Sequence, residues 1–428
     1  MMDFILQITG FLIAVVVLVQ VVLTLRMSLH QYQLRRKLMH QHIEDAGQTF
    51  KIHRLSQEHI QQQESLVWNG YRKFHVDRKE YEDRNGNICS FYLVPHDGRR
   101  LPAFLPGQFL TLRLNIVAPQ DRRQRGRATV RCYSLSDYSR NPEYYRITVK
   151  RLSPQKADPD TPPGVVSNFL HDYVGEGDIL DIEAPKGKFC LDMTSQTPIV
   201  LIGGGIGITP MLCMLNTIAE SDSSREVWFF YGTLNSDDII LNDHLIRLAK
   251  AKENVHVHRC YSKPYDEDIQ EADTHTGHVS VDLFKRLLPS SNYSFYICGP
   301  PPMMQSITQD LNTWGVSDEH IFFEAFGPAT VKPQVREESK DTASDLTVTF
   351  SKSGETYPWD PETLSILDFA ESKGVAMDGG CRIGNCNTCL TAIKEGEVRY
   401  VHDPDTVPNQ GSCLTCVSVP AGKLILDA

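Results

Sequence analysis

The sequence lacks an excess of positive charge. Its 43 Lys and Arg residues stand against 53 Asp and Glu residues, which gives a formal net charge of -10. An acidic chain is not expected to bind nucleic acid, which is itself anionic. The sequence also lacks an internal repeat and any convincing pairing of nucleophile and base for hydrolysis. With 428 residues, of which 41% are hydrophobic, it is long enough for roughly three packed domains.

A secreted disulfide framework is missing as well. Of the 11 cysteines, four fall into one pattern near the C-terminus, and the other seven are scattered and odd in number. Extracellular domains that depend on disulfides usually carry an even set at regular spacings. The cysteine usage therefore favours a reducing compartment such as the cytoplasm.

The start of the chain has no charge from Phe4 to Leu25. A run of this length can cross a bilayer as a helix. A cleavable signal peptide is the alternative, but the start has no Lys or Arg and no small-residue cleavage site. Four basic residues follow: Arg26, Arg35, Arg36 and Lys37. By the positive-inside rule, residues 1–25 are predicted to be a single transmembrane anchor in the cytoplasmic membrane, with the catalytic domains in the cytoplasm.

The rest of the chain changes pattern several times. Residues 26–69 are rich in Gln, His, Lys and Arg and are predicted to form a juxtamembrane helical stalk. In residues 70–190, short β-branched and aromatic runs alternate with turns, which is typical of an antiparallel β-barrel. In residues 191–327, apolar strands alternate with helical patterns, which predicts an α/β domain with a parallel sheet. A polar linker over 328–344 then leads to a small α+β domain over 345–428.

Four cysteines in this last domain carry the strongest signal. Cys381, Cys386 and Cys389 have the spacing C-x₄-C-x₂-C, and Cys416 follows. This spacing is that of plant-type [2Fe–2S] ferredoxins, and the resemblance to them implies a β-grasp-like fold for this domain. Zinc is the alternative, because Cys413 and Cys416 form a second C-x₂-C pair, but it would leave Cys381 idle. In the ferredoxins that the sequence resembles, the last ligand lies in a Leu-Thr-Cys run, which favours Cys416 over Cys413.

A second motif lies in the predicted barrel. On a strand, Arg131 and Tyr133 of the run RCYS point to one face. A guanidinium suits an anionic phosphate, and a tyrosine ring and the hydroxyl of Ser134 suit a flavin ring. The run that begins at Gly164 and contains Ser167 opens a helix, whose free N–H groups can bind phosphate. A simple N-terminal cap is the alternative role for Ser167.

A glycine-rich turn follows the predicted strand PIVLI and opens a helix. It has the sequence GGGIGITP, which departs from the dinucleotide fingerprint G-x-G-x-x-G. Such a turn lets a pyrophosphate approach the backbone at a helix N-terminus. The run Cys298-Gly299-Pro300 ends another strand of the same predicted sheet, where ligands of open α/β sheets bind. The residues expected to bind nicotinamide are Gly204, Gly205, Gly207, Thr209, Pro210, Gly299 and Pro300.

Together these motifs resemble the ferredoxin–NADP reductase superfamily. The runs RCYSLS, ITVKR and GVVSNFLH are similar to the reductase part of flavohaemoglobins, and the domain order over about 70–428 is similar to that of phthalate dioxygenase reductase. The resemblance implies that Arg131, Tyr133 and Ser134 hold the flavin and that Val149 lines its pocket. It places Gly164, Val166 and Ser167 at the flavin pyrophosphate. GVVSNFLH favours FAD, with FMN as the alternative.

The resemblance also implies the residues nearest the chemistry. Cys298 would lie beside the nicotinamide ring, although a buried structural cysteine is the plain alternative. Phe326 of the run EAFG would cover the flavin where nicotinamide enters. Ser134, Cys298 and Glu324 are therefore the predicted catalytic residues. The acidic run after Tyr231 favours NADH over NADPH, while Lys263 leaves NADPH open.

The sequence thus predicts a membrane-anchored NAD(P)H-dependent oxidoreductase. A hydride would pass to the flavin, and single electrons would pass to the [2Fe–2S] cluster and on to an oxygenase, hydroxylase or desaturase. Quinone or respiratory reduction is the first alternative, and a redox-sensing membrane protein is the second. The acceptor and the oligomeric state are not determined by the sequence.

Overall fold

The structure is a computed structural model. It describes residues 20, 26–27, 66–116, 127–152, 164–221, 223–326, 346–382, 384, 386–401, 404 and 408–428. The chain divides into one unit of residues 1–66 and another of residues 67–428. The linker predicted over 328–344, and nearly all of the predicted anchor and stalk, lie outside the described residues. Among those that are described, no helix has the length and apolar character needed to cross a membrane.

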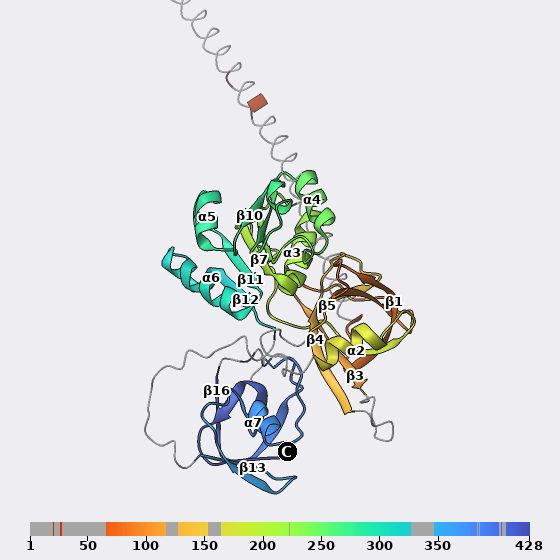
Figure 1. Ribbon diagram of the computed structural model, residues 1–428, viewed down its shortest axis with the longest axis vertical. Helices are drawn as coiled ribbons and strands as arrows, with labels where there is room; N and C mark the ends of the chain where they lie inside the picture. Colours follow the sequence, from red (N-terminus) through yellow and green to blue (C-terminus); the bar gives the residue numbers. More distant parts are fainter. Residues whose placement is uncertain are drawn as a thin grey trace, which may run out of the picture. The chain divides into compact units, whose positions relative to one another are not determined.

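The first domain of the larger unit is an antiparallel barrel of six strands that is nearly closed (Figure 1). The strand order is β4-β3-β6-β1-β2-β5, and a bridge between Leu135 and Ile147 joins the two ends of the sheet. The strands are β1 (Tyr71–Tyr81), β2 (Ile88–Pro95), β3 (Phe109–Ile116), β4 (Arg127–Ser134), β5 (Tyr145–Lys150) and β6 (Ile179–Glu183).

Alternation along the strands forms the core of this barrel. Phe74 and Val76 on β1 are buried while their neighbours are more exposed, as the two-residue period of a strand requires. The helix α2 (Val165–Tyr173) packs against the barrel through Val166 and Leu170. Its C-terminal carbonyl groups accept hydrogen bonds from the Lys79 ammonium, at 2.7 Å for His171 and 2.6 Å for Val174.

The second domain is built on a parallel sheet of order β10-β9-β8-β7-β11-β12. Its strands are β7 (Ile199–Gly204), β8 (Val227–Thr233), β9 (Val255–Tyr261), β10 (Thr274–Thr276), β11 (Ser294–Cys298) and β12 (Ile321–Glu324). Four helices follow strands: α3 (Ile208–Glu220), α4 (Asn242–Ala251), α5 (Val281–Leu287) and α6 (Pro301–Thr313). Helices α3 and α4 cover one face and α5 and α6 the other (Figure 1).

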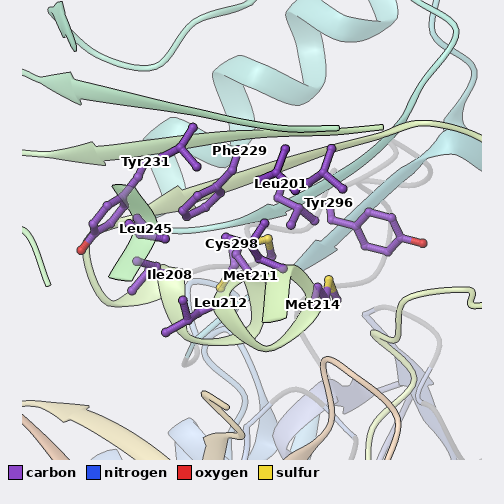
Figure 2. Close-up of a cluster of buried hydrophobic side chains, with 14 of the residues drawn as sticks. Leu201, Ile208, Met211, Leu212, Met214, Phe229, Tyr231, Leu245, Tyr296 and Cys298 are labelled. Atoms are coloured by element: carbon purple, nitrogen blue, oxygen red, sulfur yellow. The ribbon is translucent and has the colours of Figure 1, made fainter. Parts of the chain in front are cut away.

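The core on the α3 face is large and apolar. Figure 2 shows Leu201, Phe229 and Cys298 from the sheet meeting Met211 and Leu212 from α3, all of them buried. Strands buried on both faces read as continuous apolar runs, which is why the sequence pattern identified this sheet. Helix α4 begins at Asn242, after a turn in which the N–H of Asp238 bonds the carbonyl of Asn235.

The third domain is small and mixed. A five-stranded sheet of order β14-β13-β19-β15-β17 packs against α7 (Ile366–Ser372). Its strands are β13 (Thr347–Phe350), β14 (Glu355–Pro358), β15 (Leu390–Glu395), β17 (Ser412–Leu414) and β19 (Leu424–Leu426), with β16 (Val398–Tyr400) and β18 (Ser418–Pro420) paired separately. The expected multidomain architecture of barrel, parallel sheet and ferredoxin-like domain is confirmed.

Candidate functional site

The RCYS strand lines a cavity of about 450 Å³. Arg131, Tyr133 and Ser134 from β4 and Val149 from β5 form part of its wall. These strands carry the predicted flavin residues at the nearly closed edge of the barrel. The remaining predicted residues in the wall are Ser167, Thr209, Glu324, Phe326 and Cys381.

The charges of this cavity suit an anionic ligand with an aromatic ring. Burial, and next the nearby Arg382 guanidinium, lower the pKa of Arg131, but an arginine keeps its charge in a protein. Burial raises the pKa of Tyr133, so this phenol is neutral and can donate a hydrogen bond. Phe326 is 44% exposed, which leaves its side chain able to cover a ligand.

Two of the predicted catalytic residues meet in this cavity. The Ser134 hydroxyl donates to Glu324 Oε2 at 3.2 Å, across 190 positions of sequence. Both side chains are buried. Ser134 ends β4 of the barrel and Glu324 ends β12 of the parallel sheet, so the contact joins the two domains.

The helix α2 contributes only part of what was predicted for it. Ser167 lines the cavity, and its hydroxyl accepts from the N–H of Leu152 at 3.2 Å. Gly164 is the N-cap, and a Cβ there would lie 2.6 Å from Ser167 Oγ and 2.7 Å from Leu152 Cβ. Val166 instead lies in the barrel core and does not line the cavity.

A second cavity, of about 540 Å³, lies at the carboxyl ends of the parallel strands. Gly204 and Gly205 after β7 and Pro300 after β11 line it, as predicted residues. Asp238 is the acidic residue of its wall, and Lys150 from the barrel is its basic one. Thr233, Ser262, His278 and Ser306 complete its polar lining.

Two other predicted glycines act by close approach. A Cβ on Gly207 would lie 2.2 Å from the Cys298 carbonyl oxygen, and one on Gly299 would lie 2.4 Å from Met303 Cε. At Gly207 the obstructing atom is backbone, so no side chain fits there, and at Gly299 a side chain would displace Met303. These glycines let the turn after β7 pack against the turn after β11.

Three other predicted residues lie elsewhere than expected. Thr209, assigned to nicotinamide, lines the first cavity. Pro210 is buried in α3. Cys298 is fully buried in the core beneath α3 (Figure 2) and lines neither cavity. Burial, and next Glu324, raise the pKa of its thiol, so the thiol is neutral. Its catalytic role stays a prediction.

The four cysteines predicted to hold the cluster come together in pairs. Cys389 Sγ and Cys416 Sγ lie 3.1 Å apart. Each N–H of Cys381 and Cys386 donates to the other residue's sulfur, at 3.1 and 3.3 Å. Cys413 is fully buried in the domain core. In the described part of the chain, no three His, Cys, Asp or Glu side chains are arranged to hold a metal ion. Paired thiols are what a cluster of two irons and four cysteines needs.

Sequence reasoning missed several residues of the first cavity. Thr148, Lys150, Arg151 and Ile206 belong to its wall, and so do Gly380 and Arg382 of the cluster loop. Arg382 is held by Asp368, at 3.0 Å, and by Glu371, at 2.5 Å, both on α7. Thr148, Lys150 and Arg151 stand in the run ITVKR, and Ile206 stands in the glycine-rich turn, so the motifs marked their neighbourhood. That these side chains reach the cavity follows only from the packing of separate elements.

Comparisons with known proteins agree with this geometry. Residues 201–309 match the oxidoreductase NAD-binding domain family, and residues 348–421 match the 2Fe-2S iron–sulfur cluster binding domain family. A flavohaemoprotein of Bacillus thuringiensis subsp. konkukian is 41% identical over 263 residues, which are 61% of this chain and 62% of that relative. This chain therefore spans about three-fifths of the length of the flavohaemoproteins it matches.

Two solved structures cover the chain differently. The FAD/NAD-binding domain of a nitric oxide dioxygenase from Vibrio cholerae is 30% identical, with a TM-score of 0.52, over 61% of this chain and 100% of that one. Phthalate dioxygenase reductase is 25% identical, with a TM-score of 0.51, over 84% of this chain and 98% of that one.

The chain is therefore an oxidoreductase of the ferredoxin reductase type. It belongs to the family of flavohaem-like FAD- and NAD-binding domains, and it adds a 2Fe-2S cluster binding domain at its C-terminal end. The predicted flavin, nicotinamide and iron–sulfur cofactors are confirmed at this level.

Proposed function

We propose that this protein is a membrane-anchored reductase that takes electrons from NAD(P)H and delivers them through FAD and a [2Fe–2S] cluster to a partner oxygenase, hydroxylase or desaturase. When bound, FAD accepts a hydride, and the cluster carries one electron at a time. One observation carries the proposal. The wall of the flavin cavity is made by the RCYS strand and also by Gly380, Cys381 and Arg382 of the cluster loop.

Each residue of the cavity has its own proposed role. Arg131 would hold the flavin phosphate as a charged donor, and Tyr133 would lie against the ring. Ser134 would orient the ring edge, with its hydroxyl fixed by Glu324 at 3.2 Å. Phe326 would shield the ring face until nicotinamide enters. The four thiols at Cys381, Cys386, Cys389 and Cys416 would hold the cluster.

The partner is proposed from a relative with the same domain order. Phthalate dioxygenase reductase is described as a modular structure for electron transfer from pyridine nucleotides to [2Fe–2S], and it matches nearly its whole length here. An oxygenase-type acceptor therefore suits this chain. The uncharged run from Phe4 to Leu25 supports the anchor, which would keep the reductase beside a membrane-bound acceptor.

The nicotinamide cavity supports NADH as the donor. Its described wall holds the carboxylate of Asp238 and no arginine, and its one lysine, Lys150, comes from the barrel. The Asp238 carboxylate would repel a 2′-phosphate. Lys263 does not line this cavity.

The test is an anaerobic titration of the full-length chain purified in detergent. A yellow-brown protein whose flavin and cluster bands both bleach with NADH, and more slowly with NADPH, would support the proposal. A protein that bleaches with neither nucleotide would contradict it. Adding quinone or cytochrome c to the reduced protein then separates quinone reduction from one-electron delivery to a protein.

The anchor needs a separate test. Cells that produce the full chain, or residues 26–428 alone, are fractionated, and NADH-dependent reduction of ferricyanide is measured in each fraction. We expect carbonate-resistant membrane activity only for the full chain. Equal activity of the full chain in the soluble fraction would exclude the anchor.

A further inference from the structure

One stripe of helix α3 faces the barrel along its length. Thr209, Cys213, Asn216 and Glu220 are spaced by four, three and four residues, so they lie on one side of a helix. Thr209 lines the flavin cavity, and Cys213 is buried within the barrel core. Glu220 lines a third cavity, of about 390 Å³, together with Asp137 of the barrel. Asn216 donates a hydrogen bond across to Asp137.

Asn216 is the centre of a directed chain of hydrogen bonds. Its Nδ2 donates to Asp137 Oδ1 at 2.9 Å, and its Oδ1 lies 2.8 Å from His244 Nε2. A carboxylate only accepts, so the amide nitrogen must face Asp137 and the amide oxygen must face His244. His244 therefore carries its proton on Nε2. The Asn216 side chain is buried, so water cannot easily replace either partner.

Asp137 is in turn fixed to the barrel. Its Oδ2 accepts from the Tyr144 hydroxyl at 2.9 Å and lies 3.5 Å from Arg146 Nη1. The Arg146 guanidinium is buried and donates to the Ser136 carbonyl and hydroxyl. The Ser136 hydroxyl bonds that of Thr148 at 2.8 Å, and Thr148 lines the flavin cavity.

The other end of α3 carries the ligand-binding turn. Gly204 and Gly205 line the nicotinamide cavity just before the helix, and Ile206 lines the flavin cavity. Asn216 lies seven residues beyond Thr209, which is about 10 Å along the axis. A helix moves as a rigid body over this distance, so a shift at Asn216 reaches the turn. A misplacement of about 1 Å at a reacting centre can slow a reaction by about a hundredfold.

We propose that Asn216 is a positioning residue, which through Asp137 fixes α3 against the barrel and so sets the approach of nicotinamide to the flavin. The inference rests on the proposed NAD(P)H-dependent function. It gives the buried amide of Asn216, which lines neither the flavin cavity nor the nicotinamide cavity, a role in the rate of hydride transfer.

The test uses the full-length holoenzyme and four variants. Asn216→Ala removes both hydrogen bonds, and Asn216→Asp sets two carboxylates against each other. The swap Asp137→Asn with Asn216→Asp restores the bond between these two side chains, because the new amide on the barrel would donate to the new carboxylate on α3, which still accepts from His244. It gives up the bond that Asp137 Oδ1 accepts from the N–H of its chain neighbour Tyr138, at 2.9 Å. The oxygen of that amide would still accept from Tyr144. Asn254→Ala is the matched control, since Asn254 Nδ2 bonds only within the nicotinamide domain, to the Arg225 carbonyl at 2.7 Å and the Ser223 carbonyl at 3.4 Å.

The first readout is the rate of anaerobic flavin bleaching at saturating NADH. We expect both single variants at Asn216 to be slowed about tenfold or more with FAD content unchanged, as misplacement of the reacting groups predicts. The swap should return to within about threefold of the wild type, and Asn254→Ala should keep the wild-type rate. Wild-type rates in the single variants, or a swap no faster than they are, would overturn the proposal.

Calorimetry separates this inference from the proposed function. If neither nucleotide bleaches the wild type, the proposed function fails, but the two domains can still be tested for coupling. We expect the wild type, the swap and Asn254→Ala each to unfold both domains in one transition, and Asn216→Asp to split it into two. A single transition in Asn216→Asp would overturn the coupling on its own.

Discussion

At the scale of single residues, cluster binding depends on which of two neighbouring cysteines turns its sulfur toward the other predicted ligands. Cys413 and Cys416 are three positions apart and equally plausible by spacing, yet their environments differ. Cys416 Sγ lies 3.1 Å from Cys389 Sγ, while Cys413 packs in the apolar core of the domain. A short helical turn over Thr415–Val417 lies between the two positions, so their side chains point in different directions.

The fourth cluster ligand can therefore be tested by a pair of variants. We expect Cys416→Ser to lose the cluster, with iron falling from about two atoms per chain while FAD stays bound. Cys413→Ser should keep its iron, because its side chain faces the core. Iron analysis and the visible spectrum check both. Loss of iron in Cys413→Ser alone would assign the ligand to Cys413.

Donor preference is a second property of one residue. We expect Asp238→Asn to raise kcat/KM for NADPH by about three- to tenfold and to change that for NADH little, because a carboxylate in the cavity repels the 2′-phosphate. Asp237→Asn is the control, since Asp237 pairs with Arg84 and does not line the cavity. Steady-state assays with both nucleotides measure kcat/KM in the two variants. An equal change in the two variants would refute the role of Asp238.

At the scale of elements, the helix α2 depends on a partner from another strand. It is nine residues long and has no basic residue in its last turn except His171. The ammonium of Lys79 on β1 supplies the missing charge by donating to three of its last carbonyls, those of Leu170, His171 and Val174. A cation at a helix C-terminus also opposes the negative end of the helix dipole.

Removing this cation should weaken the barrel measurably. We expect Lys79→Met to lower the free energy of unfolding by about 1–3 kcal/mol, because it leaves partly buried carbonyls without a charged donor. Lys73→Met on the same strand breaks only an exposed ion pair with Asp181, which is worth at most about 1 kcal/mol. Urea unfolding compares the two. Equal losses would show that Lys79 is not a special cap.

At the scale of the whole molecule, three domains meet around the flavin cavity. The barrel gives Arg131 and Ser134, the parallel sheet gives Glu324, and the ferredoxin-like domain gives Cys381 and Arg382. Electron delivery depends on this meeting, because transfer between cofactors needs a short and fixed separation. Arg382 lies at this junction, because it lines the cavity together with Arg131 of the barrel, while two carboxylates of α7 hold its guanidinium in place within its own domain.

Coupling between the flavin and the cluster should therefore depend on Arg382. We expect Arg382→Ala to leave the rate of flavin bleaching by NADH unchanged and to slow cluster reduction at least about fivefold, as a loosened geometry predicts. Glu371→Gln is the control, because it keeps the arginine and its bond to Asp368. Stopped-flow absorbance at flavin and cluster wavelengths separates the steps. Unchanged cluster reduction in Arg382→Ala would exclude the coupling role.

The sequence by itself determined the order of the domains and the chemistry of the main motifs. The period of the apolar residues distinguishes an alternating barrel strand such as β1 from a strand buried on both faces such as β7. The spacing of the predicted cluster ligands Cys381, Cys386 and Cys389 is a local property of one loop, so the sequence shows it directly. Arg131, Tyr133 and Ser134 could be predicted to share one site because one strand carries all three, and they line one cavity. The predicted anchor over 1–25 stays a prediction.

Only the tertiary structure decided which distant residues share a site. Ser134 and Glu324 are 190 positions apart, and their contact arises because the ends of β4 and β12 meet between two domains. Thr209 faces the flavin cavity, whereas Val166 faces the barrel core. Packing against the neighbouring sheet sets the rotation of each helix about its axis, and no local sequence pattern shows that rotation. The bond between Asn216 and Asp137 has the same origin. Close packing of separate elements, a property of the whole fold, selects these pairs.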